Sequence, residues 1–171
     1  MEFYDVLQKR HSVRDFSDKE VDNQKLKALI DAAVRAPSAG NLQAYKLYVV
    51  RSKTAREGLV AATNYQDFVA KAPVIFVFCM DIRRAAAKYG ERGETLYGIQ
   101  DATLAAAYCQ LAATAEGLSS VWVGGFDPLE VSRVINAGPY QVPVCVLPVG
   151  YTNASPQITE RRPLKELVRE A

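Results

Sequence analysis

Hydrophobic and polar residues follow each other along this chain in blocks that predict both helices and strands. After Asp22, apolar side chains recur at spacings of three and four residues through Val34, which is typical of an amphipathic helix with Asp22 as its N-cap. Residues 46–50 and 74–79 are rich in β-branched and aromatic side chains and predict strands. The block 74–79 has no polar alternation, which indicates a strand that is covered on both faces.

The middle of the chain predicts its longest helix. Alanine side chains crowd the stretch from about Thr95 to Glu116, and Gly117 is placed to end it. Because small residues let another helix approach closely, we expect a buried central helix. The preceding stretch, 81–93, is charged and ends in Tyr-Gly-Glu-Arg-Gly, which predicts a mobile loop. Ser52 is placed to cap a short helix through Leu59.

The last third of the chain predicts two more strands, at 119–123 and 142–151, with a short helix between them. Asp127-Pro128 has the cap and the first-turn proline of a helix start. We expect Pro143 and Pro148 to interrupt the last strand, because proline cannot donate a ladder hydrogen bond. A final short helix is opened by Pro163. Helices between four strands predict a layered sandwich of helices and a sheet.

Composition narrows the function classes. The chain has 171 residues, 49% of them hydrophobic, which predicts a single domain spanning 1–171. Its 21 basic and 19 acidic residues give a net charge of +2, which is too balanced for a dedicated nucleic-acid binder. No basic leader with an apolar core opens the chain, and no apolar run approaches the roughly 20 residues of a membrane helix. We therefore expect a cytoplasmic protein without a membrane partner.

Several common kinds of site find no support in the sequence. Cys79, Cys109 and Cys145 are far apart in apolar segments, which predicts buried reduced thiols. With a single histidine, His11, and no Cys-x-x-Cys, we expect no metal site. His11 has no evident nucleophile partner, so a hydrolase is poorly supported. The glycine fingerprints of dinucleotide and P-loop sites are missing.

Two polar clusters could carry the chemistry instead. Three cations and a hydroxyl lie between Lys9 and Arg14, and such a set suits a phosphate, although alone it could be a solvated surface run. The second cluster, 36–45, lies between a predicted helix and a predicted strand. Its hydroxyl and amide side chains both donate and accept hydrogen bonds and could read the edge of a heterocycle, although alone they would suit an ordinary connection.

Together the two clusters resemble a known signature. Arg-His-Ser-Val-Arg at 10–14 and Ala-Pro-Ser-Ala-Gly-Asn-Leu-Gln at 36–43 resemble the flavin-binding signature of the nitroreductase family, the FMN-dependent NAD(P)H oxidoreductases. Similar matches follow at 122–127 and at Arg161-Arg162. The resemblance implies an α+β fold, a three-layer α/β/α sandwich with a mostly antiparallel central sheet. It also implies an intertwined homodimer whose C-terminal arm, 152–171, reaches the partner subunit.

The resemblance also implies which residues bind FMN. Arg10 and Ser12 would lie toward the phosphate, Arg14 near the N1/C2 carbonyl edge, and the backbone N–H of Gly124 toward flavin N5. Residues of the 36–43 loop, namely Pro37, Ser38, Asn41 and Gln43, would touch the flavin of the other subunit. Arg161 and Arg162 would close over the phosphate. The implied cofactor-binding residues are Arg10, His11, Ser12, Arg14, Pro37, Ser38, Asn41, Gln43, Asn64, Gly124, Gly125, Arg161 and Arg162. Ala44-Tyr45 replaces the usual Pro-Trp, and Asp67 replaces a family lysine.

The implied function is electron transfer in a ping-pong cycle. NADH or NADPH would deliver a hydride to flavin N5 and leave, and a small-molecule acceptor such as a nitroaromatic compound or a quinone would take the electrons. No side chain need act as acid or base in the first half-reaction. The alternatives are a specialised flavin reductase or reductive dehalogenase of the same fold, and a non-enzymatic flavin-binding protein. A nucleic-acid-binding module, resting on the basic residues from Lys9 to Arg14 and on Arg161-Arg162, is a third.

Overall fold

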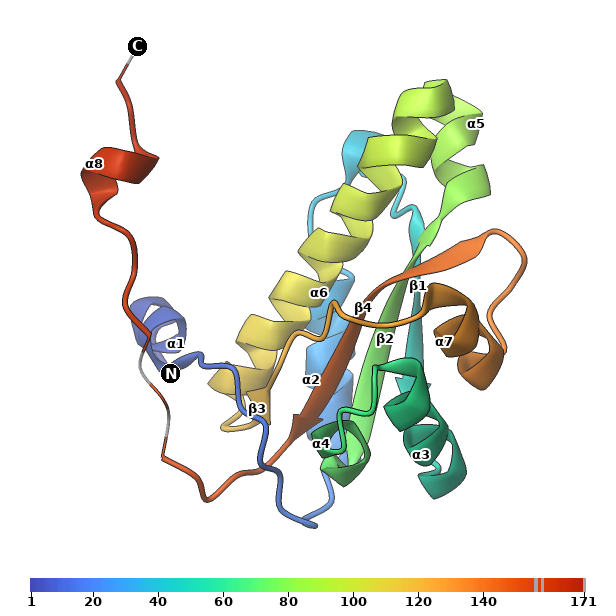
Figure 1. The fold of residues 1–171 in the computed structure, drawn as a ribbon. Helices are drawn as coiled ribbons and strands as arrows, with labels where there is room; N and C mark the ends of the chain where they lie inside the picture. Colours follow the sequence, from blue (N-terminus) through green and yellow to red (C-terminus); the bar gives the residue numbers. More distant parts are fainter. Residues whose placement is uncertain (156, 158, 171) are drawn as a thin grey trace.

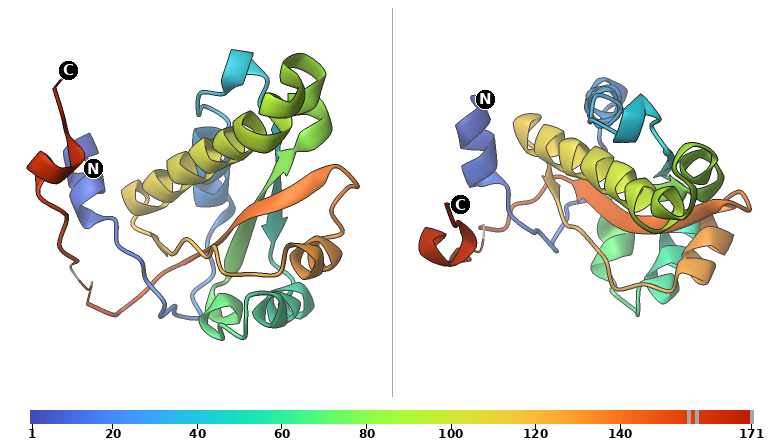
Figure 2. Two further views of the ribbon diagram at one scale, coloured as in Figure 1. Left: turned by 45° about the horizontal axis from the view of Figure 1, so that its top comes forward. Right: turned by 90° about the horizontal axis from the view of Figure 1, so that it is seen from above.

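The computed structural model describes residues 1–155, 157 and 159–170. Its centre is a four-stranded antiparallel sheet in the order β1-β2-β4-β3. The strands are β1 (Tyr45–Val50), β2 (Val74–Asp81), β3 (Ser119–Ser120) and β4 (Gln141–Gly150). Helices cover both faces of the sheet, so the predicted three-layer α+β sandwich is confirmed (Figures 1 and 2).

Each face of the sheet has its own helical layer. One layer is made by α2 (Asn23–Ala33) and α6 (Gly98–Ala115), and the other by α3 (Lys53–Ala62), α4 (Phe68–Lys71) and α7 (Pro128–Ile135). Alternate residues of β2 serve the two layers, because Phe76 and Phe78 pack with α2 and α6 while Ile75 and Val77 pack on the opposite face. All four side chains are fully buried. The prediction that this strand is covered on both faces is confirmed.

The helix starts were predicted from their capping residues, and these are confirmed. Asp22 accepts a hydrogen bond from the N–H of Lys25 at the start of α2, and Ser52 accepts one from Ala55 at the start of α3. Asp127 accepts from the N–H groups of Leu129 and Glu130 at the start of α7. These side chains satisfy first-turn donors that have no partner within the helix.

The prediction of a mobile loop at 81–93 is wrong, because this stretch forms α5 (Ile82–Arg92) and leads into the π-helical turn η2 (Gly93–Tyr97). The side chain of Asp81 caps α5 by accepting from the N–H of Arg84 at 2.8 Å. Ala85 is buried while the charged side chains face solvent. The charges therefore belong to the outer face of a helix, and Gly90, with φ of 54°, makes a kink within it.

The last strand also differs from its prediction, because β4 runs without interruption through both prolines. Pro143 lies opposite Cys79, where the register shifts at a β-bulge. The carbonyl of Pro148 accepts from the N–H of Val121, so its missing donor faces the side of β3. Since β3 has only two residues, not the predicted five, that side offers little ladder to disrupt.

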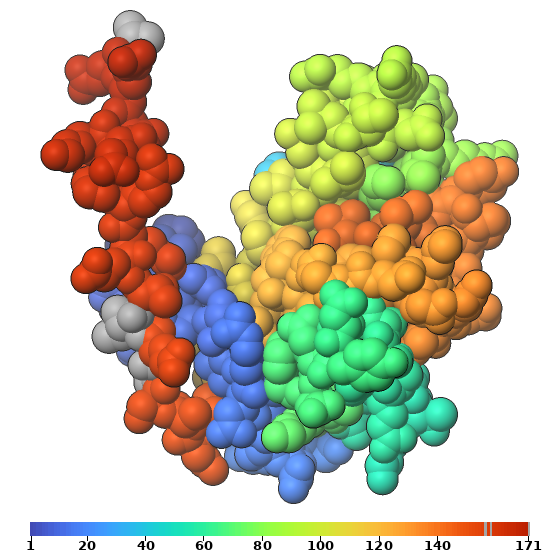
Figure 3. All heavy atoms as spheres, viewed as in Figure 1, coloured from blue at the N-terminus to red at the C-terminus, as the bar shows by residue number. Residues whose placement is uncertain are grey.

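The N-terminal helix and part of the C-terminal arm lie side by side, outside the sandwich. The first helix, α1 (Phe3–Lys9), stands beside the C-terminal arm, which contains α8 (Leu164–Leu167) (Figure 1). The upper part of the arm stands away from the body (Figure 3). Residues 156, 158 and 171, which belong to the predicted arm 152–171, lie outside the described residues. Among the described residues, no helix combines the length and the apolar character needed to cross a membrane.

The three cysteines are buried and form no disulfide, as predicted. Burial raises the pKa of Cys79 to about 12, because a thiolate would lose its hydration there. Burial also raises the pKa values of Cys109 and Cys145 far above the usual range. The thiols therefore stay protonated and behave as small apolar core residues.

Candidate functional site

The basic segment near the N-terminus is held along β3. The N–H of Val13 donates to the carbonyl of Ser120 at 3.0 Å, and Ser12 forms a parallel bridge with Ser120. Further on, the N–H of Ser17 donates to the carbonyl of Tyr151 at 2.9 Å. The backbone is thus hydrogen-bonded at Val13 and at Ser17, while the side chains of Ser12 and Arg14 remain exposed.

This placement brings the basic segment next to two other predicted site segments. The guanidinium of Arg14 lies 6.0 Å from the ring centroid of Phe68, beside the connection between α3 and α4. That connection reaches the double glycine, because Gln66 Nε2 donates to the carbonyl of Gly125 at 3.2 Å. A Cβ added to Gly125 would lie 3.7 Å from Asn64 Nδ2. Residues from three distant parts of the sequence therefore meet here.

The two glycines leave backbone open to a ligand. Neither Gly124 nor Gly125 has a positive φ, so neither is required by the backbone conformation. A Cβ at Gly124 would meet only the indole of Trp122, at 3.6 Å from its Nε1, which is an ordinary contact distance. Both glycines are exposed. Since neither backbone conformation nor a close neighbour calls for glycine at 124, the open backbone fits a site for a closely approaching ring.

The C-terminal arm completes a basic hollow. Arg161, Arg10 and His11 line a cavity of about 320 Å³, and Ser12 and Arg14 line a second one of the same size together with Asp15. Within the described part of the chain, Arg10, Arg14 and Arg161 form no salt bridge. Cations without a carboxylate partner fit an anionic ligand, and Arg10 and Arg161, which share one hollow, suit a phosphate. Arg162 differs, because its Nε pairs with Glu166 at 3.2 Å.

We call this assembly the cluster half of the candidate site. The structure links its members by successive contacts from the arm to the N-terminal segment, and from there through the α3–α4 connection to the double glycine. Its members are Arg10, His11, Ser12, Arg14, Asn64, Gly124, Gly125 and Arg161.

The remaining predicted residues, Pro37, Ser38, Asn41 and Gln43, form a separate group that we call the loop half. They lie around the short helix η1 (Ala39–Asn41), next to the N-terminal end of α6. The basic segment of the cluster half, in which Ser12 bridges to Ser120 of β3, lies by the other end of α6 (Figure 1). Because α6 has 18 residues, its ends are about 27 Å apart. One chain therefore does not bring the two halves together.

The loop half has an unusual backbone held by its own side chains. Gly40, Asn41 and Gln43 have φ values of 53°, 58° and 44°. For residues other than glycine, this left-handed conformation costs roughly 1 to 2 kcal/mol each. The hydroxyl of Ser38 accepts from the N–H of Gln43 at 3.0 Å, and Gln43 Nε2 donates to the carbonyl of Asn41 at 2.6 Å. Strain persisting in a loop of this kind is typical of a functional site.

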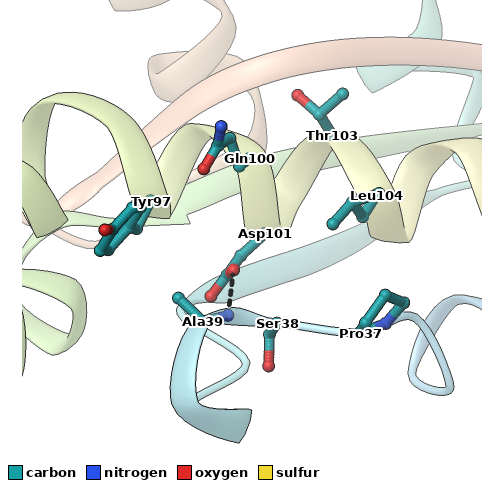
Figure 4. Close-up of a pocket in the computed structure, with 8 residues that line it drawn as sticks. All are labelled: Pro37, Ser38, Ala39, Tyr97, Gln100, Asp101, Thr103 and Leu104. Atoms are coloured by element: carbon teal, nitrogen blue, oxygen red, sulfur yellow. Dashed lines mark hydrogen bonds between the residues drawn. The ribbon is translucent and has the colours of Figure 1, made fainter. Parts of the chain in front are cut away.

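Sequence reasoning missed the residue that anchors this loop, Asp101. Its side chain is 2% exposed, and its two oxygens accept from the N–H of Ala39 at 2.8 Å and from the N–H of Ala44 at 3.1 Å. Figure 4 shows the carboxylate pointing from α6 to the loop, in a hollow of about 480 Å³. A lone carboxylate at the start of an alanine-rich, apolar helix was the signal that could have identified it.

The presence of Ala44-Tyr45 in place of the usual Pro-Trp also has a structural explanation. Ala44 is buried and donates its N–H to Asp101, so a proline at this position could not make the contact. The hydroxyl of Tyr45 donates to the carbonyl of Ala33 at 3.3 Å, which ties β1 to α2. Burial, and then the charge of Asp101, raises the pKa of the Tyr45 hydroxyl.

Comparisons with known proteins agree with this architecture. The sequence model of the Nitroreductase family matches residues 7–63 and 57–151. An oxygen-insensitive NADPH nitroreductase of Salmonella typhimurium is 28% identical over 173 residues, covering 97% of this chain and 72% of that protein. An NADPH-flavin oxidoreductase of Vibrio harveyi is 26% identical over 168 residues, covering 93% of this chain and 69% of that protein.

A solved structure extends the match to three dimensions. The crystal structure of a nitroreductase family protein from Streptococcus pneumoniae superimposes with a TM-score of 0.89 at 28% sequence identity, covering 99% of this chain and all of that one. The family match spans both the basic segment and the loop, and the fold match spans nearly the whole chain. This chain therefore belongs to the nitroreductase family.

Proposed function

We propose that this protein is an FMN-dependent oxidoreductase that takes electrons from NADH or NADPH and passes them to a small acceptor, such as a nitroaromatic compound or a quinone. Family membership and the names of its relatives support an NAD(P)H-dependent oxidoreductase that uses a flavin. We further propose a ping-pong order, in which the oxidised nucleotide leaves before the acceptor binds. Bound FMN would supply the redox chemistry, accepting a hydride and returning two electrons.

The observation that carries the proposal is the composition of the cluster half. It combines Arg10, Arg14 and Arg161, which have no salt-bridge partner among the described residues, with exposed glycine backbone and the amide of Asn64. These groups bind and orient a ligand, and none of them is a typical nucleophile. Such a set suits an enzyme whose cofactor performs the reaction while the protein positions it.

The residues fit FMN in two ways. Arg10, His11 and Arg161 around one hollow would hold the terminal phosphate. Arg14, in the neighbouring hollow, would place a positive charge near the ring, where it would stabilise negative charge that develops on reduction. The N–H of Gly124 would be a donor at the ring, since this residue is exposed and has no side chain of its own.

We also propose that the working unit is a homodimer in which the loop half of one chain completes the cluster half of the other. The helix α6 is mainly apolar and has no distinct polar face, and such helices are normally buried. Yet Leu104 and Tyr108, which lie one turn apart on the same face of α6, are 37% and 40% exposed in the single chain. Covering this face with a second copy would bury the apolar surface and bring the separated halves together.

The arm fits the same assembly. Residues 1–171 would form one FMN-binding domain, with 152–171 as an arm that reaches the partner. Leu164, Leu167 and Val168 are 76%, 56% and 63% exposed on the part of the arm that stands away from the body. Exposed apolar side chains on such a segment favour contact with a second chain over a free tail.

Flavin binding and reduction together test the proposal. The purified protein, supplied with FMN, should show a flavin absorption spectrum, which NADH or NADPH should bleach without oxygen and an added nitroaromatic compound or quinone should restore. Arg14→Ala should weaken FMN binding by about tenfold or more if the guanidinium contacts the ring edge.

The matched control for that variant is Arg51→Ala. Arg51 is an exposed cation outside the cluster half that donates to Asn23 at 3.0 Å. This variant should bind FMN like the unmodified protein. A protein that binds no flavin would contradict the proposal outright. A protein that binds FMN but is not reduced by either nucleotide would be a flavin-binding protein without this activity.

A further inference from the structure

We propose that Asp101 is a positioning residue whose carboxylate gives the loop half the shape in which it serves the partner's flavin site. This inference rests on the proposed two-chain FMN site. Asp101 itself is assigned no contact with the flavin, and its effect would be transmitted through the loop.

The first argument is the way in which the carboxylate is bound. Asp101 is 2% exposed and forms no salt bridge among the described residues. A buried charge of this kind is costly unless hydrogen bonds compensate for it. Here the compensation comes from two backbone N–H groups of a single loop, those of Ala39 and Ala44. The carboxylate is therefore committed to that loop.

The second argument is where those two N–H groups lie. Ala39 immediately precedes the strained residues and Ala44 immediately follows them, so Asp101 holds both ends of the stretch 40–43. Figure 4 shows the bond to Ala39. The carboxylate therefore fixes the span of the loop and opposes its relaxation to ordinary backbone angles. Asn41 and Gln43, which we expect to face the flavin, lie within this span.

The third argument links the loop to the proposed dimer. Asp101 projects from α6 one turn before Leu104, which belongs to the apolar face that we expect a second chain to cover. The loop is thereby anchored to the helix that would touch the partner, and its position relative to the partner's cluster half is set by one carboxylate.

Asparagine is the informative replacement. Asp101→Asn keeps the size of the side chain but leaves one acceptor oxygen and places an N–H₂ group against a backbone N–H. One of the two anchoring bonds must therefore be lost. We expect FMN to bind about tenfold weaker in the Asp101→Asn dimer. Asp22→Asn, which changes a helix cap of the same chemistry outside the site, should leave FMN affinity unchanged.

Mixed dimers distinguish loop positioning from a general structural role. Chains with different affinity tags are co-expressed, and FMN affinity and stoichiometry are measured on the purified heterodimers. In a dimer of Asp101→Asn with Arg14→Ala, one site carries both lesions and the other carries neither. We therefore expect one FMN per dimer to bind with normal affinity. In a dimer of Asp101→Asn with Asn41→Ala, each site carries one loop lesion, so no normal site should appear.

The dimer of Arg14→Ala with Asn41→Ala provides the reference. If it has one normal site but Asp101→Asn with Arg14→Ala has none, Asp101 supports its own chain generally and the inference is wrong. If the reference dimer itself has no normal site, the two-chain FMN site fails and the inference falls with it. Asp101→Asn binding FMN as tightly as the unmodified protein would also refute the inference.

A measurement on the unmodified FMN-loaded protein covers the case in which Asp101→Asn does not fold. If the carboxylate holds the loop, the amides of Ala39 and Ala44 should exchange with deuterium about tenfold more slowly than the exposed amides of the arm. Exchange of both amides at the rate of the arm would overturn the inference.

Discussion

The cluster half and the loop half of the candidate site are built on opposite principles. In the cluster half, the N-terminal cations project from a segment that is hydrogen-bonded to β3 through Val13, and the side chains of Ser12 and Arg14 are exposed. In the loop half, polar side chains bind one another, and the backbone is held in a left-handed conformation by a buried carboxylate. The first half therefore offers charge to a ligand, and the second offers a fixed shape.

The difference predicts how each half responds to change. Charge acts through space and tolerates small movements, so the cluster half should lose ligand affinity without loss of folding stability. Shape depends on backbone angles, so the loop half should lose both when its backbone is altered. The two halves can be compared by the following four predictions, ordered from the largest expected effect to the smallest.

Arg10→Ala should produce the largest change. If Arg10 makes a charge-assisted contact with the phosphate, FMN binding should weaken by roughly 2 to 3 kcal/mol, while the urea unfolding midpoint of the flavin-free protein stays unchanged. Fluorescence titration with FMN measures the affinity. An unchanged affinity would remove the basic segment from the site.

Gly40→Ala and Gly124→Ala compare the two halves directly. Gly40 has φ of 53°, and a Cβ there would collide with the Tyr89 hydroxyl and Lys88 Nζ, so unfolding free energy should fall by about 1 to 2 kcal/mol. At Gly124 the added Cβ meets only ordinary contacts, so stability should change by less than about 0.5 kcal/mol while FMN binding weakens. Equal losses of unfolding free energy in Gly40→Ala and Gly124→Ala would contradict the proposed difference between the two halves.

The pKa of Tyr45 provides a probe of the loop half. Burial and the charge of Asp101 raise this pKa above 10.0, so the folded state holds the phenolic proton more tightly than the unfolded state. The resulting stabilisation is complete below about pH 10 and is lost as pH rises through the folded pKa. Subtracting the ultraviolet titration of Tyr45→Phe isolates this residue. Asp101→Asn should lower the pKa of Tyr45, and no change would show that burial alone raises it.

The smallest expected difference between the two halves is in how FMN affinity depends on salt concentration. FMN affinity should fall as ionic strength rises, because exposed cations of the cluster half are screened. Arg10→Ala should reduce this salt dependence, whereas Asn41→Ala, a neutral change in the loop half, should lower affinity without altering it. Titrations at several sodium chloride concentrations make the comparison. An equal loss of salt dependence in both variants would place charge recognition elsewhere.

Local signals in the sequence predicted most of the fold. Capping by Asp22, Ser52 and Asp127 depends on neighbouring residues alone, and the buried strand β2 is evident from its unbroken apolar run. The charged stretch 81–93 was misread because outward-facing charges hide a helix that is anchored by only a few apolar contacts. Pro148 was misread because its tolerance depends on which neighbour its missing donor faces, and that is a property of the sheet.

The residues of the candidate site could be predicted from the family signature, and only partly from the chemistry of their side chains. Arg10–Arg14 and the 36–45 loop could be singled out from their side chains, but their separation by α6 is visible only in three dimensions. Asp101 was missed because both of its partners are backbone groups more than fifty residues away in sequence, which leave no trace in residue types. The carry-over of individual residues to FMN remains a prediction.

The strand order has a consequence for the making of the protein. Since β4 lies between β2 and β3, the sheet cannot close until residues 141–150 have left the ribosome. Until then β2 lacks its partner on one side, and the apolar α6, already synthesised, has only part of the surface on which it packs. Nascent chains that stall before β4 would expose an unpaired strand edge beside an apolar helix, and such chains would be prone to aggregate.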